Sequence, residues 1–154
     1  MATVNSDQAQ KIYDNSQSGG YNVNKLSTNE YNGRVRLFYA HYGVKTAISA
    51  ATTINLIEVP AGRILPTSKV YFGAGGTNST LDIGYAAYTA DDGTEIAADG
   101  DALLDGVSTA SAGSAELAQN PEGVILKGKA MITADTAVFA ANKAIDAYIF
   151  CVVD

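Results

Sequence analysis

From residue 33 onward, apolar residues come in short runs that are separated by clusters of Gly, Pro, Asn and Asp. Several runs alternate apolar and polar residues with a period of two, which is the period of a β-strand with one buried face. Segments with a helical period are almost absent. Short strands at regular spacing, with turn residues between them, are typical of a sandwich or a barrel. The sequence therefore predicts a single all-β domain over residues 33–154.

The apolar runs predict about eight short strands, a number that suits a jelly-roll-like β-sandwich. Between them, residues 108–114 are small and polar and are expected to form a loop, and residues 120–123 are expected to form a turn. Residues 101–106 fit either one helical turn or a short strand. The other expected strands are residues 34–39, 53–59, 69–72, 80–88, 124–131, 136–139 and 146–153.

Three of these runs carry a further signal. In the first run, Val35, Leu37 and Tyr39 share one face. In the second run the apolar face changes between Leu56 and Ile57, which indicates a β-bulge. The last run is apolar on both faces, as expected for a central strand that is buried on both sides.

Residues 1–32 differ in composition and are rich in Asn, Ser, Gln and Thr. Such a segment buries too little apolar surface to offset the entropy lost when it becomes ordered. It still carries large apolar side chains at wide intervals, which would fill pockets on a partner if it docked in extended form. An extended N-terminal arm and a disordered tail both stay open, and residues 7–14 fit a short helix. The candidate partner-binding residues are Ile12, Tyr13, Tyr21, Val23, Leu26 and Tyr31.

The charge of the chain limits its partners. The net charge is −6, and the ten Lys and Arg residues are scattered from Lys11 to Lys143. Nucleic acids and anionic membrane surfaces both require a positive patch, so neither is expected as a partner. No apolar stretch approaches the ~20 residues that span a bilayer, and the N-terminus lacks the regions of a secretion signal. Charged residues make up only 17%, which suggests that partners cover part of the surface.

Residue types that catalyse reactions are scarce. His41 is the only histidine and Cys151 the only cysteine. A metal-dependent cupin needs several His ligands, and a zinc site built on His41 and Cys151 would lack two ligands. We therefore interpret His41 as a surface or interface residue at a strand end, and Cys151 as a small core residue. Neither an enzyme activity nor a cofactor is expected.

Two further patterns resemble ligand sites. The glycine-rich residues 73–77 lack the Lys-Ser/Thr pair of a phosphate-binding loop, so a tight turn is predicted there. An acidic stretch offers oxygen ligands of the kind that Ca²⁺ prefers, but its spacing does not match an EF-hand loop. Solvated loop charge and a calcium site both stay open. The carboxylates are Asp91, Asp92, Glu95, Asp99, Asp101 and Asp105.

Three segments together resemble small structural proteins of tailed bacteriophage heads. They are Leu-Ile-Glu-Val-Pro-Ala-Gly-Arg-Ile-Leu at 56–65, Thr-Leu-Asp-Ile-Gly-Tyr at 80–85 and Asp-Ala-Leu-Leu at 101–104, followed by a last apolar strand. The resemblance covers roughly residues 50–153 and is one of pattern and composition. It implies a head decoration, or cement, protein with a β-sandwich core. Such a protein is assembled in the host cytoplasm, forms a homotrimer and binds the major capsid protein on the outer surface of the virion.

Two other functions stay open. The same folds serve in receptor-binding or fibre modules that recognise glycans. The chain has no Trp for stacking on a sugar, although Tyr42, Tyr85 and Tyr88 offer a substitute. A small cupin-like or lyase-like enzyme is the second alternative, and His41 would have to carry its chemistry.

Overall fold

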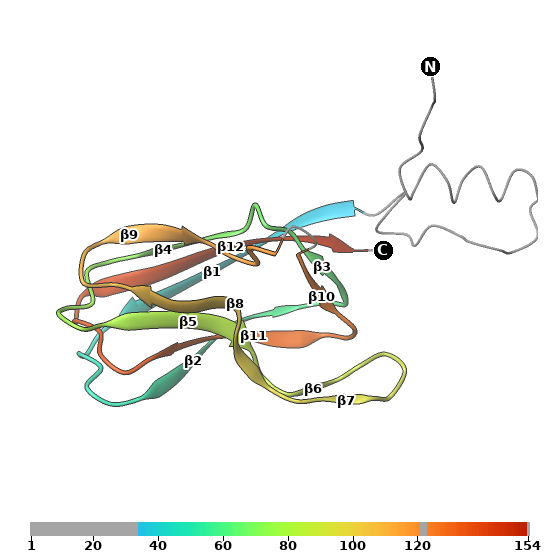
Figure 1. Cartoon of the computed structure of the whole chain (residues 1–154), viewed down its shortest axis with the longest axis horizontal. Helices are drawn as coiled ribbons and strands as arrows, with labels where there is room; N and C mark the ends of the chain where they lie inside the picture. Colours follow the sequence, from blue (N-terminus) through green and yellow to red (C-terminus); the bar gives the residue numbers. More distant parts are fainter. Residues whose placement is uncertain (1–33, 121–122, 154) are drawn as a thin grey trace, which may run out of the picture.

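A computed structural model of the chain describes residues 34–120 and 123–153. These residues form twelve β-strands and no helix. Most of the strands belong to two sheets that pack face to face, as Figure 1 shows. The predicted all-β sandwich is therefore confirmed. Within the described residues, no helix is long and apolar enough to cross a membrane.

The larger sheet has six strands in the order β10-β3-β12-β4-β9, and β1 pairs with β12. All of its pairings are antiparallel. On its other edge, β12 pairs with β4 and β3 in succession. The long central strand therefore joins the whole sheet. The strands are β1 (Arg34–Val44), β3 (Gly62–Ile64), β4 (Lys69–Phe72), β9 (Gly113–Glu116), β10 (Val124–Leu126) and β12 (Lys143–Val153).

The smaller sheet has four strands in the order β2-β11-β5-β8. A separate two-stranded hairpin extends from it (Figure 1). The sheet consists of β2 (Thr52–Val59), β5 (Thr80–Tyr85), β8 (Asp99–Ser108) and β11 (Ala130–Thr136), and the hairpin of β6 (Tyr88–Thr89) and β7 (Glu95–Ile96).

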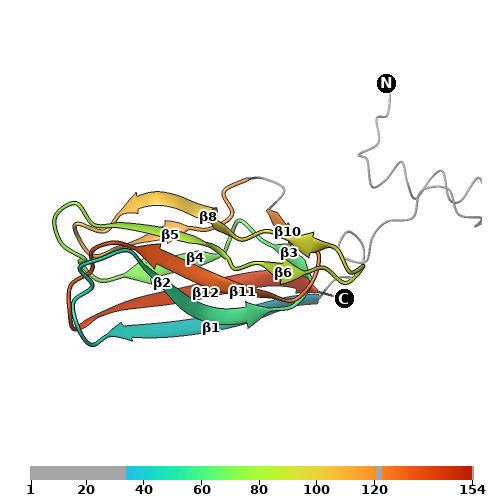
Figure 2. The same ribbon diagram turned by 90° about the horizontal axis from the view of Figure 1, so that it is seen from below.

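The strand order identifies the sandwich as a jelly roll. Without the short strands β3 and β10, the two sheets read β1-β12-β4-β9 and β2-β11-β5-β8. Each sheet thus alternates strands from the first and second halves of the chain, as two interlocked Greek keys require. Figure 2 shows β1 and β8 along opposite long sides of the sandwich.

The core lies between the two sheets. Along β12, every second side chain points inward, and Ile145, Ala147, Ile149 and Cys151 are fully buried. Burial raises the pKa of the Cys151 thiol to about 11, which is consistent with the predicted core role of this residue. The expected burial of both faces of this strand is wrong, because its outward side chains are only half-buried over most of its length.

The predicted bulge in β2 is confirmed. Ile57 pairs with Ile132 and Asn55 with Thr133, so Leu56 has no partner in the register. The extra residue lets Ile54 and Ile57 both face the core although they are three positions apart. This explains the change of apolar face in the sequence.

Several predicted boundaries differ from the structure, and in one case the chain changes sheets inside an apolar run. Residues 124–131 form two strands, since β10 pairs with β3 in the larger sheet and β11 with β2 in the smaller. The strand expected at 136–139 is only a single bridge between Phe139 and Ile48. Of the two alternatives for residues 101–106, the strand is confirmed, because these residues belong to β8. The predicted loop at 108–114 missed the start of β9.

Candidate functional site

The outer face of the larger sheet carries a row of apolar and aromatic side chains. The full antiparallel register of β1 on β12 places Val35 opposite Val152, Leu37 opposite Phe150, and Tyr39 opposite Tyr148. In β4, Tyr71 pairs with Asp146 and so lies on the same face. We call this surface the aromatic face, consisting of Val35, Leu37, Tyr39, Tyr71, Tyr148 and Phe150.

The aromatic face is open to solvent. The exposed fraction is 59% for Val35, 53% for Leu37 and 48% for Tyr39. Ile125 in β10 extends the row, because it pairs with Arg63, which pairs with Val152. Single exposed apolar residues are common on proteins, whereas a contiguous patch marks an interaction site.

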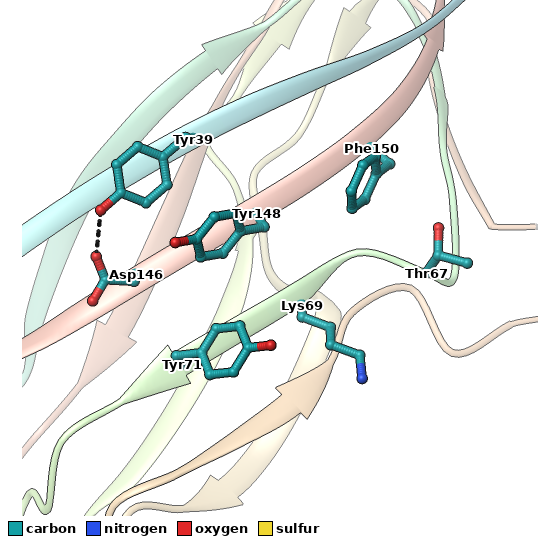
Figure 3. Close-up of a pocket in the computed structure, with 7 residues that line it drawn as sticks. All are labelled: Tyr39, Thr67, Lys69, Tyr71, Asp146, Tyr148 and Phe150. Atoms are coloured by element: carbon teal, nitrogen blue, oxygen red, sulfur yellow. Dashed lines mark hydrogen bonds between the residues drawn. The ribbon is translucent and has the colours of Figure 1, made fainter.

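A shallow hollow of about 590 Å³ lies in the aromatic face. Figure 3 shows the side chains that line it. The rings of Tyr39 and Tyr148 are 4.9 Å apart between centroids, and Tyr71 meets Tyr148 edge-on at 5.7 Å. Aromatic contacts of this kind hold the rings in fixed positions. Lys69 stands at the rim, with its Nζ 3.5 Å from the carboxylate of Glu116. The hollow therefore has a preformed aromatic wall with a charged rim.

Asp146 adds the main polar group of the hollow. The Tyr39 hydroxyl donates a 2.7 Å hydrogen bond to Oδ1 of Asp146, and His41 Nδ1 lies 2.7 Å from the same oxygen. Burial raises the pKa of the Asp146 carboxyl, but the bonds from His41 and Tyr39 outweigh burial and keep the pKa below its usual value. The bond to Asp146 raises the pKa of Tyr39 to about 12. His41 is exposed, as predicted, but lies within β1 and not at its end.

The six predicted carboxylates do not form one site. Asp91, Asp92 and Glu95 lie in the β6–β7 hairpin, whereas Asp99, Asp101 and Asp105 lie in β8. Among the described residues, no group of three or more His, Cys, Asp or Glu side chains is placed to hold a metal ion. The calcium interpretation thus gains no support from the structure.

The hairpin carboxylates stabilise the turn itself. The Thr94 backbone N–H donates a 2.9 Å hydrogen bond to Oδ1 of Asp92. This bond lowers the pKa of Asp92. In β8, a hydrogen bond with Asp101 and burial together raise the pKa of Asp99.

A second hollow, of about 320 Å³, lies on the outside of the smaller sheet and is lined by acidic residues. Asp82 and Asp135 are paired across β5 and β11. Asp101 and Asp105 of β8 complete the lining, and we call these four residues the acidic hollow. Asp82 accepts a hydrogen bond from the Gly106 backbone N–H. The sequence analysis named only Asp101 and Asp105 of these four residues. Asp82 and Asp135 lie far from them in the sequence and are brought beside them by strand pairing.

The glycine-rich residues connect β4 of the larger sheet to β5 of the smaller sheet, and no helix begins after them. A Cβ on Gly75 would lie 2.7 Å from the Thr109 hydroxyl, so the backbone is packed too tightly there for another side chain. Ser79 and Thr109 share a buried 2.5 Å hydrogen bond beneath this connection. A tight turn is present only at the end of the predicted stretch, where the Ser79 backbone N–H donates a 3.2 Å hydrogen bond to the Gly76 carbonyl.

The tyrosines suggested for glycan stacking are separated. Tyr85 and Tyr88 meet edge-on at 5.5 Å between ring centroids, whereas Tyr42 lies in β1 of the other sheet. The six candidate arm residues lie outside the described residues, so the arm remains a prediction. Sequence reasoning missed Tyr71 and Tyr148, although the apolar outward positions of the last strand were a signal for the aromatic face.

No protein-family model matches the chain, and no curated protein sequence matches it. Two solved structures share the fold. A chain of the capsid of Ralstonia phage GP4 is 19% identical, with a TM-score of 0.59 over 88% of this chain and 93% of that chain. A chain of the Cyanophage Pam1 capsid asymmetric unit is 15% identical, with a TM-score of 0.57 over 100% of both chains. The jelly roll described above is therefore a fold that also occurs in chains of phage capsids.

Proposed function

We propose that this chain is a non-enzymatic structural protein of a bacteriophage virion. Its fold matches chains of two phage capsids over nearly their whole length. In the finer form of the proposal, the chain is a decoration, or cement, protein. It binds the outer surface of the major capsid shell as a homotrimer and stabilises the shell.

The aromatic face is the observation that carries this proposal. Its exposed apolar side chains sit on paired strands of the larger sheet, so little conformational entropy is lost when a partner covers them. Tyr is among the residue types that contribute most to protein interfaces. The charged groups at the rim, Lys69 and Asp146, would set the orientation of the partner more than its affinity.

Threefold association would multiply weak contacts with the shell. Three linked copies bind with an effective concentration that a single copy lacks, so a modest affinity per copy is sufficient. Residues 1–32 would add contacts in extended form through Ile12, Tyr13, Tyr21, Val23, Leu26 and Tyr31.

Binding to expanded heads that were assembled without this chain tests the proposal. We expect the double variant Leu37→Ser/Tyr71→Ser to bind such heads at least about tenfold more weakly than the unaltered protein, since two interface residues are lost. The matched control is Thr53→Ala/Asn55→Ala, which changes two exposed residues of β2. Equal binding by both double variants would contradict a role for the aromatic face. If the unaltered protein does not bind, the decoration function is wrong.

The arm requires its own experiment, because its residues lie outside the described part of the chain. We expect that removal of residues 1–32 weakens head binding while the sandwich stays folded by circular dichroism. Unchanged binding would refute the arm and leave the aromatic face as the proposed contact.

Glycan recognition is a second candidate, and the hollow in the aromatic face favours it. Tyr39, Tyr71 and Tyr148 surround a concave site with a carboxylate, which is an arrangement that can hold a sugar ring. A glycan array distinguishes the two candidates. Glycan binding that disappears in Tyr39→Ala, with no affinity for heads, would favour a receptor-binding module over a decoration protein.

A further inference from the structure

One long side of the sandwich is basic and is formed by an open strand edge. β1 pairs only with β12, so its other edge, eleven residues long, has no strand partner within the described residues. Residues 34–57 contain no Asp or Glu. Arg34 and Arg36 project from the side of β1 that holds Phe38, but they are exposed because they lie at the sheet edge. Lys45 directly follows the strand, and Lys143 pairs with its last residue.

The opposite long side is acidic and carries the outer edge of β8, which has no further strand partner among the described residues, although the Ala118 backbone N–H donates a 2.8 Å hydrogen bond to the Leu103 carbonyl there. β8 pairs only with β5 among the described strands. Residues 70–126 contain no Lys or Arg. Asp101 and Asp105 are exposed on β8. Besides the acidic hollow, they line another hollow, which also includes Gln119. Their carboxylates therefore face outward with no basic side chain in the same part of the chain.

The two edges cannot meet within one molecule. β1 contacts β2, and β8 contacts β9, so β1 and β2 border one side of the sandwich while β8 and β9 border the other. Figure 2 shows β1 and β8 on opposite sides of the sandwich. Two β1 edges would repel each other because both are basic, and two β8 edges would repel each other because both are acidic. The complementary arrangement puts the β1 edge of one copy against the β8 edge of another.

From this geometry we infer that copies of this chain associate head to tail, with the Arg34–Arg36 end of β1 against Asp101 and Asp105 of the next copy. This inference rests on the proposed function, and it specifies the surface that forms the homotrimer. A contact between two different edges repeats in one rotational sense, and it closes into a ring when the rotation allows. The side chains of the aromatic face can then stay free, since along β1 they alternate with Arg34 and Arg36 and project from the outside of the larger sheet.

Charge reversal on each edge tests the contact through the oligomeric state of the full chain. The basic-edge variant is Arg34→Glu/Arg36→Glu, and the acidic-edge variant is Asp101→Lys/Asp105→Lys. Each variant places like charges on the β1 edge of one copy and the β8 edge of the next, and like-charge contacts oppose association strongly. In sedimentation equilibrium we expect each variant to need at least about tenfold more protein than the unaltered chain to form the trimer.

The fourfold variant that carries both reversals is the decisive control. Its β1 edge is acidic and its β8 edge is basic, so the two edges are complementary again. We expect it to regain the trimer. A variant with lost association and an unchanged thermal unfolding temperature shows that the contact, and not the fold, was broken.

Three results would overturn the inference. They are an unaltered chain that stays monomeric at all concentrations, edge variants that associate normally, and a folded fourfold variant that stays dissociated. Higher NaCl should also weaken the trimer, because salt screens exposed charges. These experiments can refute the head-to-tail contact without refuting the proposed decoration function. A chain that binds heads through Leu37 and Tyr71, but whose edge variants associate normally, would keep the decoration function and lose only this interface.

Discussion

The outer faces of the two sheets follow the same strand alternation but carry opposite chemistry. Outside the larger sheet, paired positions hold Leu37 with Phe150 and Tyr39 with Tyr148. Outside the smaller sheet, the pair Asp82 and Asp135 lies beside two more carboxylates of β8. An antiparallel sheet needs only one apolar face in order to pack on a core. Packing on the core therefore does not account for the apolar residues of the aromatic face, which leaves them free for the proposed partner contact.

The largest expected effect is a difference in stability loss between substitutions on the inner side and on the outer side of the larger sheet. Ile149 in β12 is fully buried, whereas Leu37 on the neighbouring strand is about half exposed. We expect Ile149→Ala to lower the free energy of unfolding by about 2–5 kcal/mol, because it leaves a cavity in the core. Leu37→Ala should cost less than about 1 kcal/mol. Urea denaturation of both variants measures the contrast, and equal losses would mean that the aromatic face supports the fold.

A smaller effect is the opposite response of two carboxylates to acid. The pKa of Asp146 is held below 3.8, so its contribution to stability is present above that pH and is lost as the pH falls through the lowered value. The pKa of Asp99 is raised above 3.8, so the folded state gains stability as Asp99 takes up a proton on acidification.

Unfolding curves of the unaltered chain, Asp146→Asn and Asp99→Asn between pH 2 and pH 7 measure this response. Relative to the unaltered chain, Asp146→Asn should be less stable at neutral pH, and this deficit should vanish towards pH 2. Asp99→Asn should be slightly more stable at neutral pH and lose that advantage in acid. The same pH dependence in both variants would contradict the assigned hydrogen bonds.

The smallest expected effect concerns repulsion within the acidic hollow. Asp105→Asn removes one of four neighbouring charges while it keeps the shape of the side chain. We expect the free energy of unfolding to rise by no more than about 0.5 kcal/mol, the usual range for surface substitutions. Asn55→Asp on β2 is the comparison, and it is expected to have the opposite effect, because it adds an exposed charge two positions from Thr53, the strand partner of Asp135. A clear loss of stability in Asp105→Asn would mean that the carboxylates bind a cation and do not merely repel one another.

The fold class and the bulge could be predicted from the sequence, because both leave local signals. These signals are the period-two alternation and the change of apolar face between Leu56 and Ile57. Strand ends at 124–131 were not predictable in this way, because the break reflects pairing with two different sheets. The aromatic face could be predicted only in part, because it too depends on pairing between strands that are distant in the sequence. Val35, Leu37 and Tyr39 shared a face in the sequence, but only the register with β12 shows that this face points outward and continues to Tyr148. The acidic hollow likewise depends on long-range pairing of Asp82 with Asp135.

Cryo-electron microscopy of heads that carry this chain, at a resolution that shows side chains, tests the central claim most directly. The account predicts that Leu37, Tyr39 and Tyr71 contact the major capsid shell and that the acidic hollow does not. An image in which the aromatic face points to solvent, while the smaller sheet rests on the shell, would contradict it.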